Sequence, residues 1–204
     1  MELPANANAM VPRFLRVVKS RRELADTWTI ELDPGGPFAF KAGQFNMMYA
    51  FGIGEAPISI SGDPAEPERL VHTIRSVGKV TEALCAAKPG ALIGIRGPYG
   101  TDWPVAAAEG SDVVVMAGGI GLAPLRPALF QLMNNRAKFG RISILYGGRT
   151  PEALLFPAEI KRLRSRFDVQ VEVTVDAAPP SWRGNVGVVT GLVRRAGFDP
   201  ANTA

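Results

Sequence analysis

The sequence predicts a small antiparallel β-barrel over residues 11–100, followed by a parallel, doubly wound α/β sheet over residues 111–204. The first part consists of short alternating segments separated by Gly- and Pro-rich turns, which is typical of a barrel. The second part alternates apolar strands with amphipathic helices, which is typical of a parallel sheet. Residues 99–110 are expected to link the two domains.

The barrel strands are predicted from periodicity. Residues 28–33 and 70–75 alternate apolar and polar side chains, as half-buried strands do. Apolar runs at residues 45–50, 58–61 and 92–96 add further strands, and residues 80–87 predict one short helix.

In the second domain, strands are predicted at residues 113–117, 142–146 and 169–175. The first is apolar throughout, so neighbours are expected on both of its sides. The third alternates valines with polar residues, which favours an edge strand. Helices are expected after the first two strands, and a short one near residues 190–196.

Composition excludes several classes of function. Of the 204 residues, 47% are apolar and 21% charged, and the net charge of +4 comes without a dense basic tract, which argues against nucleic acid binding. The single cysteine, Cys85, rules out an internal disulfide, an iron–sulfur cluster or a structural zinc held by this chain alone. No signal peptide or membrane-spanning segment is recognisable, so we expect a cytoplasmic protein without membrane insertion.

The most informative segment is residues 112–128. An apolar strand leads into Gly118-Gly-Ile-Gly121 and then into a helix with Pro124 in its first turn. Glycines there let a ligand approach the backbone, and a helix N-terminus attracts anions. The order of these elements favours a nucleotide phosphate site over an ordinary strand-to-helix turn.

A second candidate anion site lies at Gly78 and Lys79, before the short helix. The turn would supply backbone donors and a cation to a ligand. A simple helix cap with Lys79 in solvent explains the same residues, and the sequence leaves both interpretations open.

Two polar residues could flank a nucleotide. The acidic residue that a dinucleotide-binding domain carries after its second strand is absent, and Arg149 stands there. Asp176 ends the third strand, where a carboxylate binds ribose hydroxyls and repels a 2′-phosphate. This favours NADH over NADPH without deciding between them.

Other residues have plainer explanations. His72 lies inside an alternating strand and is expected to be packed, and residues 55–61 alone fit an edge strand. No paired carboxylates, Ser–His–Asp set or metal-ligand spacing is present. Chemistry without such groups is chemistry that a cofactor performs, such as hydride transfer to a flavin.

Five motifs in fixed order resemble the ferredoxin–NADP reductase superfamily, with its six-stranded barrel and nucleotide-binding sheet. They are Pro57-Ile-Ser59, Gly78-Lys-Val-Thr81, Arg96-Gly-Pro-Tyr-Gly100, Gly118-Gly-Ile-Gly-Leu-Ala-Pro124 and Tyr146-Gly-Gly-Arg149. The residues of the fourth motif are similar to those of the corresponding motif in the diaphorase (gamma) subunits of multi-subunit nickel–iron hydrogenases and sulfhydrogenases. Related electron-transfer subunits occur in dihydroorotate dehydrogenase and sulfite reductase.

The resemblance implies a flavoprotein that moves electrons between NAD(P)H and an iron–sulfur or hydrogenase-type partner subunit through FAD. In the barrel it implies flavin contacts for Ala56, Pro57, Ile58, Ser59, His72, Thr73 and Ile74, and an FAD pyrophosphate site at Gly78, Lys79, Val80 and Thr81. In the second domain it implies an NAD(P) pyrophosphate site at Gly118, Gly119, Ile120, Gly121 and Pro124, with Gly147, Gly148, Arg149 and Asp176 beside the adenosine half.

The chain departs from the family pattern in two places. Ala56 and Ile58 stand where the family commonly has an arginine and a tyrosine, so Lys79 or Arg75 would supply the charge for the flavin phosphate. Residues 1–204 do not include the family's Cys-Gly-Pro strand or its cysteine-rich tail for a [2Fe–2S] cluster, so the nucleotide domain in this sequence is expected to be incomplete. The alternative is a non-catalytic nucleotide-binding scaffold or sensor subunit. FAD or FMN, and the direction of electron flow, stay open.

Overall fold

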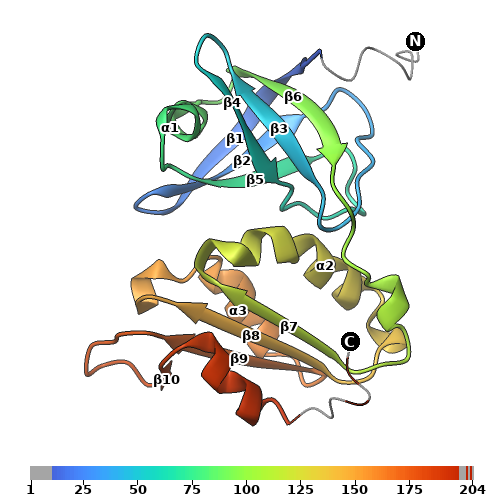
Figure 1. Cartoon of the computed structure of the whole chain (residues 1–204), viewed down its shortest axis with the longest axis vertical. Coiled ribbons are helices and arrows are strands. Elements are labelled where there is room, and N and C mark those ends of the chain that lie inside the picture. Colours follow the sequence, from blue (N-terminus) through green and yellow to red (C-terminus); the bar gives the residue numbers. More distant parts are fainter. Residues whose placement is uncertain (1–10, 198–200, 202, 204) are drawn as a thin grey trace. The chain divides into compact units, whose positions relative to one another are not determined.

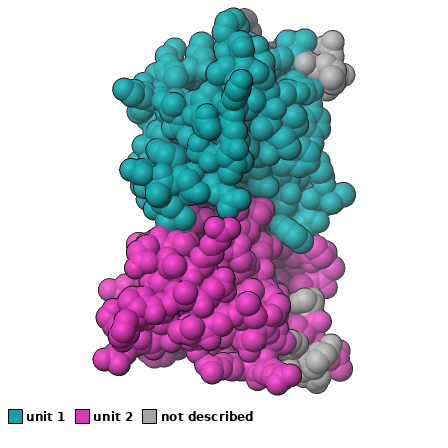
Figure 2. Space-filling model, turned by 60° about the vertical axis from the view of Figure 1, so that its left-hand side comes forward, with its two compact units in different colours: residues 1–103 teal, residues 104–204 magenta. Residues whose placement is uncertain are grey.

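The computed structural model describes residues 11–197, 201 and 203. The chain divides into two compact units, with the boundary between Trp103 and Pro104 (Figure 2). We call them unit 1 (residues 1–103) and unit 2 (residues 104–204).

Unit 1 is a six-stranded antiparallel sheet in the order β4-β3-β6-β1-β2-β5, closed into a barrel (Figure 1). The edge strands β4 and β5 meet through a single bridge between Ile60 and His72. Helix α1 packs against β3 and β5. The elements are β1 (Arg13–Leu24), β2 (Thr27–Asp33), β3 (Phe45–Ala50), β4 (Gly54–Ser59), β5 (Leu70–Arg75), α1 (Lys79–Ala86) and β6 (Leu92–Tyr99).

The predicted barrel is confirmed, with three local differences. Strand β1 was not predicted individually, because basic residues dominate it and only Leu15 and Val17 enter the core. Strand β4 begins at Gly54, four residues before the predicted run. It tolerates Pro57 because it is an edge strand. Strand β6 continues through Gly97 to Tyr99, where the sequence predicts a turn.

Unit 2 is a four-stranded parallel sheet in the order β10-β9-β8-β7, as the sequence predicts for its class. Its strands and α-helices are β7 (Val113–Gly118), α2 (Leu122–Asn134), β8 (Ile142–Gly148), α3 (Pro157–Arg164), β9 (Val169–Val175) and β10 (Asn185–Val186). Its 3₁₀ turns are η1 (Ala106–Ala108), η2 (Gly119–Gly121), η3 (Arg136–Lys138), η4 (Pro151–Ala153) and η5 (Val189–Arg195).

Helices α2 and α3 cover one face of this sheet and η5 covers the other (Figure 1). On the η5 face, Leu145 of β8 packs with Leu192 and Ala196. Because side chains alternate along a strand, its neighbour Tyr146 faces α3. The two sides of β8 therefore bury against different elements.

The expectations for the strand neighbours and the last helix of unit 2 have different outcomes. Strand β9 is not at the edge, because the two-residue β10 pairs with Thr174 and Val175. Within the described residues, β7 pairs with β8 and with no other strand. Asp112, the residue before β7, forms one parallel bridge with Thr203. The short helix expected near residues 190–196 is present as the seven-residue 3₁₀ helix η5.

Across the part of the chain that the structure describes, no helix combines the length and apolar character needed to cross a membrane.

Candidate functional site

The turn at residues 118–121 leaves its backbone uncovered. Gly119 has φ +51°, a conformation that favours glycine. Gly118 and Gly121 have φ of −123° and −60°, which any residue adopts, and no atom lies within 4 Å of a Cβ built on either. Neither conformation nor packing in this chain therefore requires glycine at these two positions. The missing side chains leave room for a ligand.

This turn also supplies donors to an anion. At the first turn of a helix, backbone N–H groups lack intrahelical acceptors, and here they belong to Gly119 and Ile120. The helix dipole of α2 adds positive potential at the same end. Pro124 is the third residue of α2.

Tyr146 holds this turn in place from the neighbouring strand. Its hydroxyl donates to the Gly119 carbonyl at 3.2 Å and accepts from the Leu155 amide at 2.8 Å. The side chain is fully buried, and burial raises its pKa, so the phenol stays protonated and remains a donor. This role of Tyr146 could not be predicted from the sequence, because its two hydrogen-bond partners lie 27 and 9 residues away in the chain.

The ends of β8 and β9 bring Arg149 and Asp176 side by side. The Asp176 amide donates to the Gly148 carbonyl at 2.9 Å, and the Ala177 amide to the Arg149 carbonyl at 3.0 Å. Both side chains are exposed. Gly147 and Gly148 are buried instead. A Cβ on Gly147 would lie 2.8 Å from Val189, and a Cβ on Gly148 would lie 2.8 Å from Leu154. Packing explains these two glycines, so only Arg149 of this segment reaches the surface.

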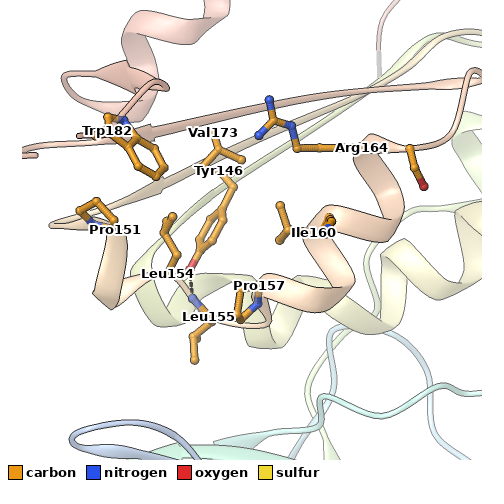
Figure 3. Close-up of a pocket in the computed structure, with 11 residues that line it drawn as sticks. Tyr146, Pro151, Leu154, Leu155, Pro157, Ile160, Arg164, Val173 and Trp182 are labelled. Atoms are coloured by element: carbon orange, nitrogen blue, oxygen red, sulfur yellow. Dashed lines mark hydrogen bonds between the residues drawn. The ribbon is translucent and has the colours of Figure 1, made fainter. Parts of the chain in front are cut away.

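Next to these strand ends, on the α3 face, unit 2 has a pocket of about 510 Å³ (Figure 3). Tyr146 and Val173 lie between its two ends, with Trp182 at one and Arg164 at the other. The Trp182 indole is fixed, because its Nε1–H donates to the Asn185 carbonyl at 3.1 Å. The pocket therefore joins an aromatic wall to a cationic rim.

The second predicted anion site, in unit 1, is built around Thr81. Its hydroxyl oxygen accepts from the amides of Val77 at 2.9 Å and Gly78 at 3.0 Å, and donates to the Gly78 carbonyl at 2.9 Å. No atom lies within 4 Å of a Cβ built on Gly78. The first-turn amides of Lys79, Val80 and Thr81 keep no intrahelical acceptor, and Lys79 is exposed.

On β4, Ile58 packs against the barrel core, and Ala56 lies on the same side of the strand. Pro57 and Ser59 alternate with them and lie on the other side. Pro57 is exposed and Ser59 half-buried. The outward side of this strand therefore offers a small apolar ring and a hydroxyl.

The three predicted residues of β5 are all buried. His72, Thr73 and Ile74 are 0%, 5% and 1% exposed. Burial lowers the pKa of His72 to about 4, so the imidazole is neutral. Any flavin contact from these residues would have to come from the backbone, since their side chains do not reach the surface.

Among the described residues, no group of three or more His, Cys, Asp or Glu side chains could hold a metal ion. Burial raises the pKa of the Cys85 thiol to about 11, which makes it a poor nucleophile and ligand.

Comparisons with known proteins agree with this architecture. The family described as an oxidoreductase NAD-binding domain matches residues 115–203. The gamma subunits of sulfhydrogenases 1 and 2 of Pyrococcus furiosus are each 34% identical to the chain, over 184 and 202 residues. These matches cover 89% and 93% of this chain, and 60% and 69% of the two relatives.

A probable dihydroorotate dehydrogenase B electron transfer subunit of Methanopyrus kandleri is 35% identical over 156 residues, which cover 76% of this chain and 56% of that protein. A ferredoxin–NADP⁺ reductase from Neisseria gonorrhoeae, solved with FAD and NADP, superposes with a TM-score of 0.78 at 20% identity. The superposed region covers 94% of this chain and 82% of the reductase chain.

Unit 2 matches the oxidoreductase NAD-binding domain family, and the chain as a whole shares the fold of the ferredoxin–NADP⁺ reductase. The chain belongs to the ferredoxin–NADP reductase superfamily, in the branch of the sulfhydrogenase gamma and dihydroorotate dehydrogenase electron-transfer subunits. The resemblance drawn from the five motifs is thereby confirmed. The chain spans between just over half and about two thirds of these relatives' length.

Proposed function

We propose that this chain is a flavoprotein electron-transfer (diaphorase) subunit that exchanges electrons between NAD(P)H and an iron–sulfur or hydrogenase-type partner through FAD. The observation that carries the proposal is the open turn at Gly118 and Gly121, where glycine serves no conformational or packing need. A nucleotide pyrophosphate lying against the backbone explains both positions.

In unit 2, Gly118, Gly119, Ile120, Gly121 and Pro124 would hold the NAD(P) pyrophosphate. Arg149 and Asp176 would flank the adenosine half, since backbone pairing places them together at the strand ends. The Asp176 carboxylate would accept hydrogen bonds from ribose hydroxyls and repel a 2′-phosphate, which favours NADH.

In unit 1, Gly78 to Thr81 would hold the FAD pyrophosphate, with Thr81 fixing the turn and Lys79 or Arg75 adding charge. Pro57 and Ser59 would meet the flavin ring from the outward side of β4. A bound flavin would supply the redox chemistry, by taking a hydride from the reduced nicotinamide and passing electrons singly to an acceptor. The protein's own part would be to orient both ligands.

A partner subunit follows from the names of the relatives, which are subunits of larger enzymes. A [2Fe–2S] cluster, where one takes part, would belong to residues outside this chain or to the partner, because one cysteine cannot ligate it.

The test is a visible absorption spectrum of the purified chain mixed with FAD, followed by anaerobic titration with NADH and then NADPH. Flavin bands that move from those of free FAD, and that bleach on addition of NADH, are the expected result. A spectrum identical to that of free FAD, with no change in flavin fluorescence, would refute the diaphorase proposal.

The second candidate is a non-catalytic nucleotide-binding scaffold or sensor subunit. It is favoured by Ala56 and Ile58, since β4 then lacks a cation for the flavin phosphate and an aromatic ring for stacking. In the same titration, NADH binding without bleaching of a bound flavin would support this candidate instead.

A further inference from the structure

The seam between β4 and β5 is the weakest join of the barrel. These strands share one backbone bridge, whereas β3 and β4 pair along their full lengths. Hydrogen bonds from buried side chains join the two strands where backbone pairing is absent. The Ser61 and Thr73 hydroxyls lie 2.9 Å apart on one face of β5, and His72 crosses the seam on the other.

The imidazole of His72 binds the end of β4 directly. Its Nδ1 lies 3.0 Å from the Ser59 carbonyl oxygen. A carbonyl only accepts, so Nδ1 carries the proton and Nε2 has a free lone pair. The Asn46 amide Nδ2 lies 3.2 Å from that Nε2 and donates to it. One tautomer therefore satisfies both hydrogen bonds.

Asn46 lies against a glycine of the Arg96-Gly-Pro-Tyr-Gly100 motif, Gly97, which leaves space for its side chain. It is fully buried, and its Oδ1 has no hydrogen-bond partner in the described structure. A Cβ on Gly97 would collide with this Oδ1, and Gly97 has φ +137°, which only glycine adopts readily. The motif thus leaves room for the Asn46 amide.

We infer that His72, supported by Asn46 and Gly97, is a positioning residue of the proposed flavin site. It fixes the Ser59 carbonyl by a hydrogen bond at the seam where β4 and β5 are hardly paired. The fixed backbone in turn positions the outward Ser59 hydroxyl. The inference rests on the proposed flavin function. It assigns a role to a histidine that touches no ligand, and to a glycine motif that the nucleotide sites do not use.

The experiment compares FAD affinity and flavin midpoint potential in four proteins: the full wild-type chain, His72→Phe, His72→Gln and Ile30→Val. Phenylalanine keeps the ring and removes both hydrogen bonds, whereas glutamine keeps a donor and an acceptor. Ile30 pairs with His72 in the barrel and is equally buried, so Ile30→Val controls for loss of stability. Asn46→Leu probes the same network should His72→Phe not fold.

We expect His72→Phe to weaken FAD binding by about tenfold and to move the midpoint potential. His72→Gln should recover most of both, and Ile30→Val should match the wild type. Wild-type affinity and potential in a folded His72→Phe or Asn46→Leu protein would overturn the inference. A wild-type chain that binds no FAD would refute the proposed function instead. Amide exchange across residues 58–61, faster in His72→Phe than in Ile30→Val, would then still decide whether His72 positions Ser59.

Discussion

The two candidate anion turns use the same physics but are built differently. The turn at Gly78 is held by Thr81, whose hydroxyl bonds only to backbone groups three and four residues away. The turn at residues 118–121 is held by Tyr146, from a different strand. The first is therefore encoded in a short stretch of sequence, and the second exists only once β7 and β8 have paired.

This difference predicts how each turn fails. A change at Thr81 should act locally on unit 1, whereas a change at Tyr146 should disturb the packing of unit 2 as well as its ligand. Changes confined to one unit should therefore affect stability and ligand binding differently in the two units.

The largest difference between the units is expected in how their stability depends on pH, because the only histidine of the sequence lies in unit 1. Folding lowers the pKa of His72 from 6.5 to about 4, so the unfolded chain binds more protons between these values. Stability is present in full above pH 6.5 and falls as the pH drops toward 4, by on the order of 3 kcal/mol. Urea unfolding of the wild type and His72→Gln from pH 7 to 4.5 measures this. An equal pH slope in both proteins would contradict the prediction.

The glycines of unit 2 should divide into two classes. Gly147→Ala should destabilise the protein by about 1–3 kcal/mol, because its Cβ meets Val189. Gly121→Ala should leave the melting temperature near that of the wild type and weaken nucleotide binding. Thermal melts and NADH titrations of both variants provide the measurement. Equal stability loss at the two positions would remove the distinction between open and packed glycines.

Tyr146→Phe should cost about 1–3 kcal/mol, because it leaves the buried Leu155 amide without its acceptor. It should also weaken NADH binding, since the Gly119 carbonyl loses its donor. Chemical denaturation combined with NADH titration tests both effects. Unchanged NADH affinity would show that the turn needs no support from β8.

Thr81→Val should cost about 0.5–2 kcal/mol through loss of the helix cap. FAD binding should weaken while NADH binding stays at the wild-type value, because the cap lies wholly in unit 1. Thr81→Ser, which keeps the hydroxyl, is the matched control. Weaker NADH binding in Thr81→Val would contradict the local character of this turn.

The smallest effect is expected at Asp176. Asp176→Asn removes a negative charge beside the proposed adenosine site and should shift the preference toward NADPH by about tenfold. Asp168→Asn changes the net charge equally at an ion pair with Arg166, and serves as the control. No change in the ratio of NADPH to NADH affinity would argue against Asp176 facing the ribose.

Much of the fold follows from local periodicity. Strands β2, β3 and β5 and the strand–glycine–helix order of unit 2 were predicted because their side chains alternate or form continuous apolar runs. Strand β1 was not predicted because five basic residues on both of its sides interrupt the alternation of apolar and polar positions; they are Arg13, Arg16, Lys19, Arg21 and Arg22. Strand β10 is only two residues long and depends on Asn185, whose amide donates to the Val173 carbonyl at 3.0 Å.

The site was predicted where its chemistry is local. The glycines at 118–121 and the turn at Gly78 carry their signal within a few residues. Tyr146, Asn46 and Trp182 were missed because their partners come from other elements of the fold. Gly147 and Gly148 show the converse, since glycines beside a predicted ligand site turned out to be required by packing.

We propose that unit 1 holds a flavin and that NADH bound at the open turn of unit 2 reduces it. Anaerobic NADH titration of the FAD-loaded wild type and of Gly121→Ala measures whether the turn is needed for this reduction. We expect equal flavin bands in both proteins, with the variant needing at least about tenfold more NADH for half-bleaching. Identical bleaching curves would contradict the role of the turn, and a wild type that holds FAD without bleaching would contradict electron transfer from NADH.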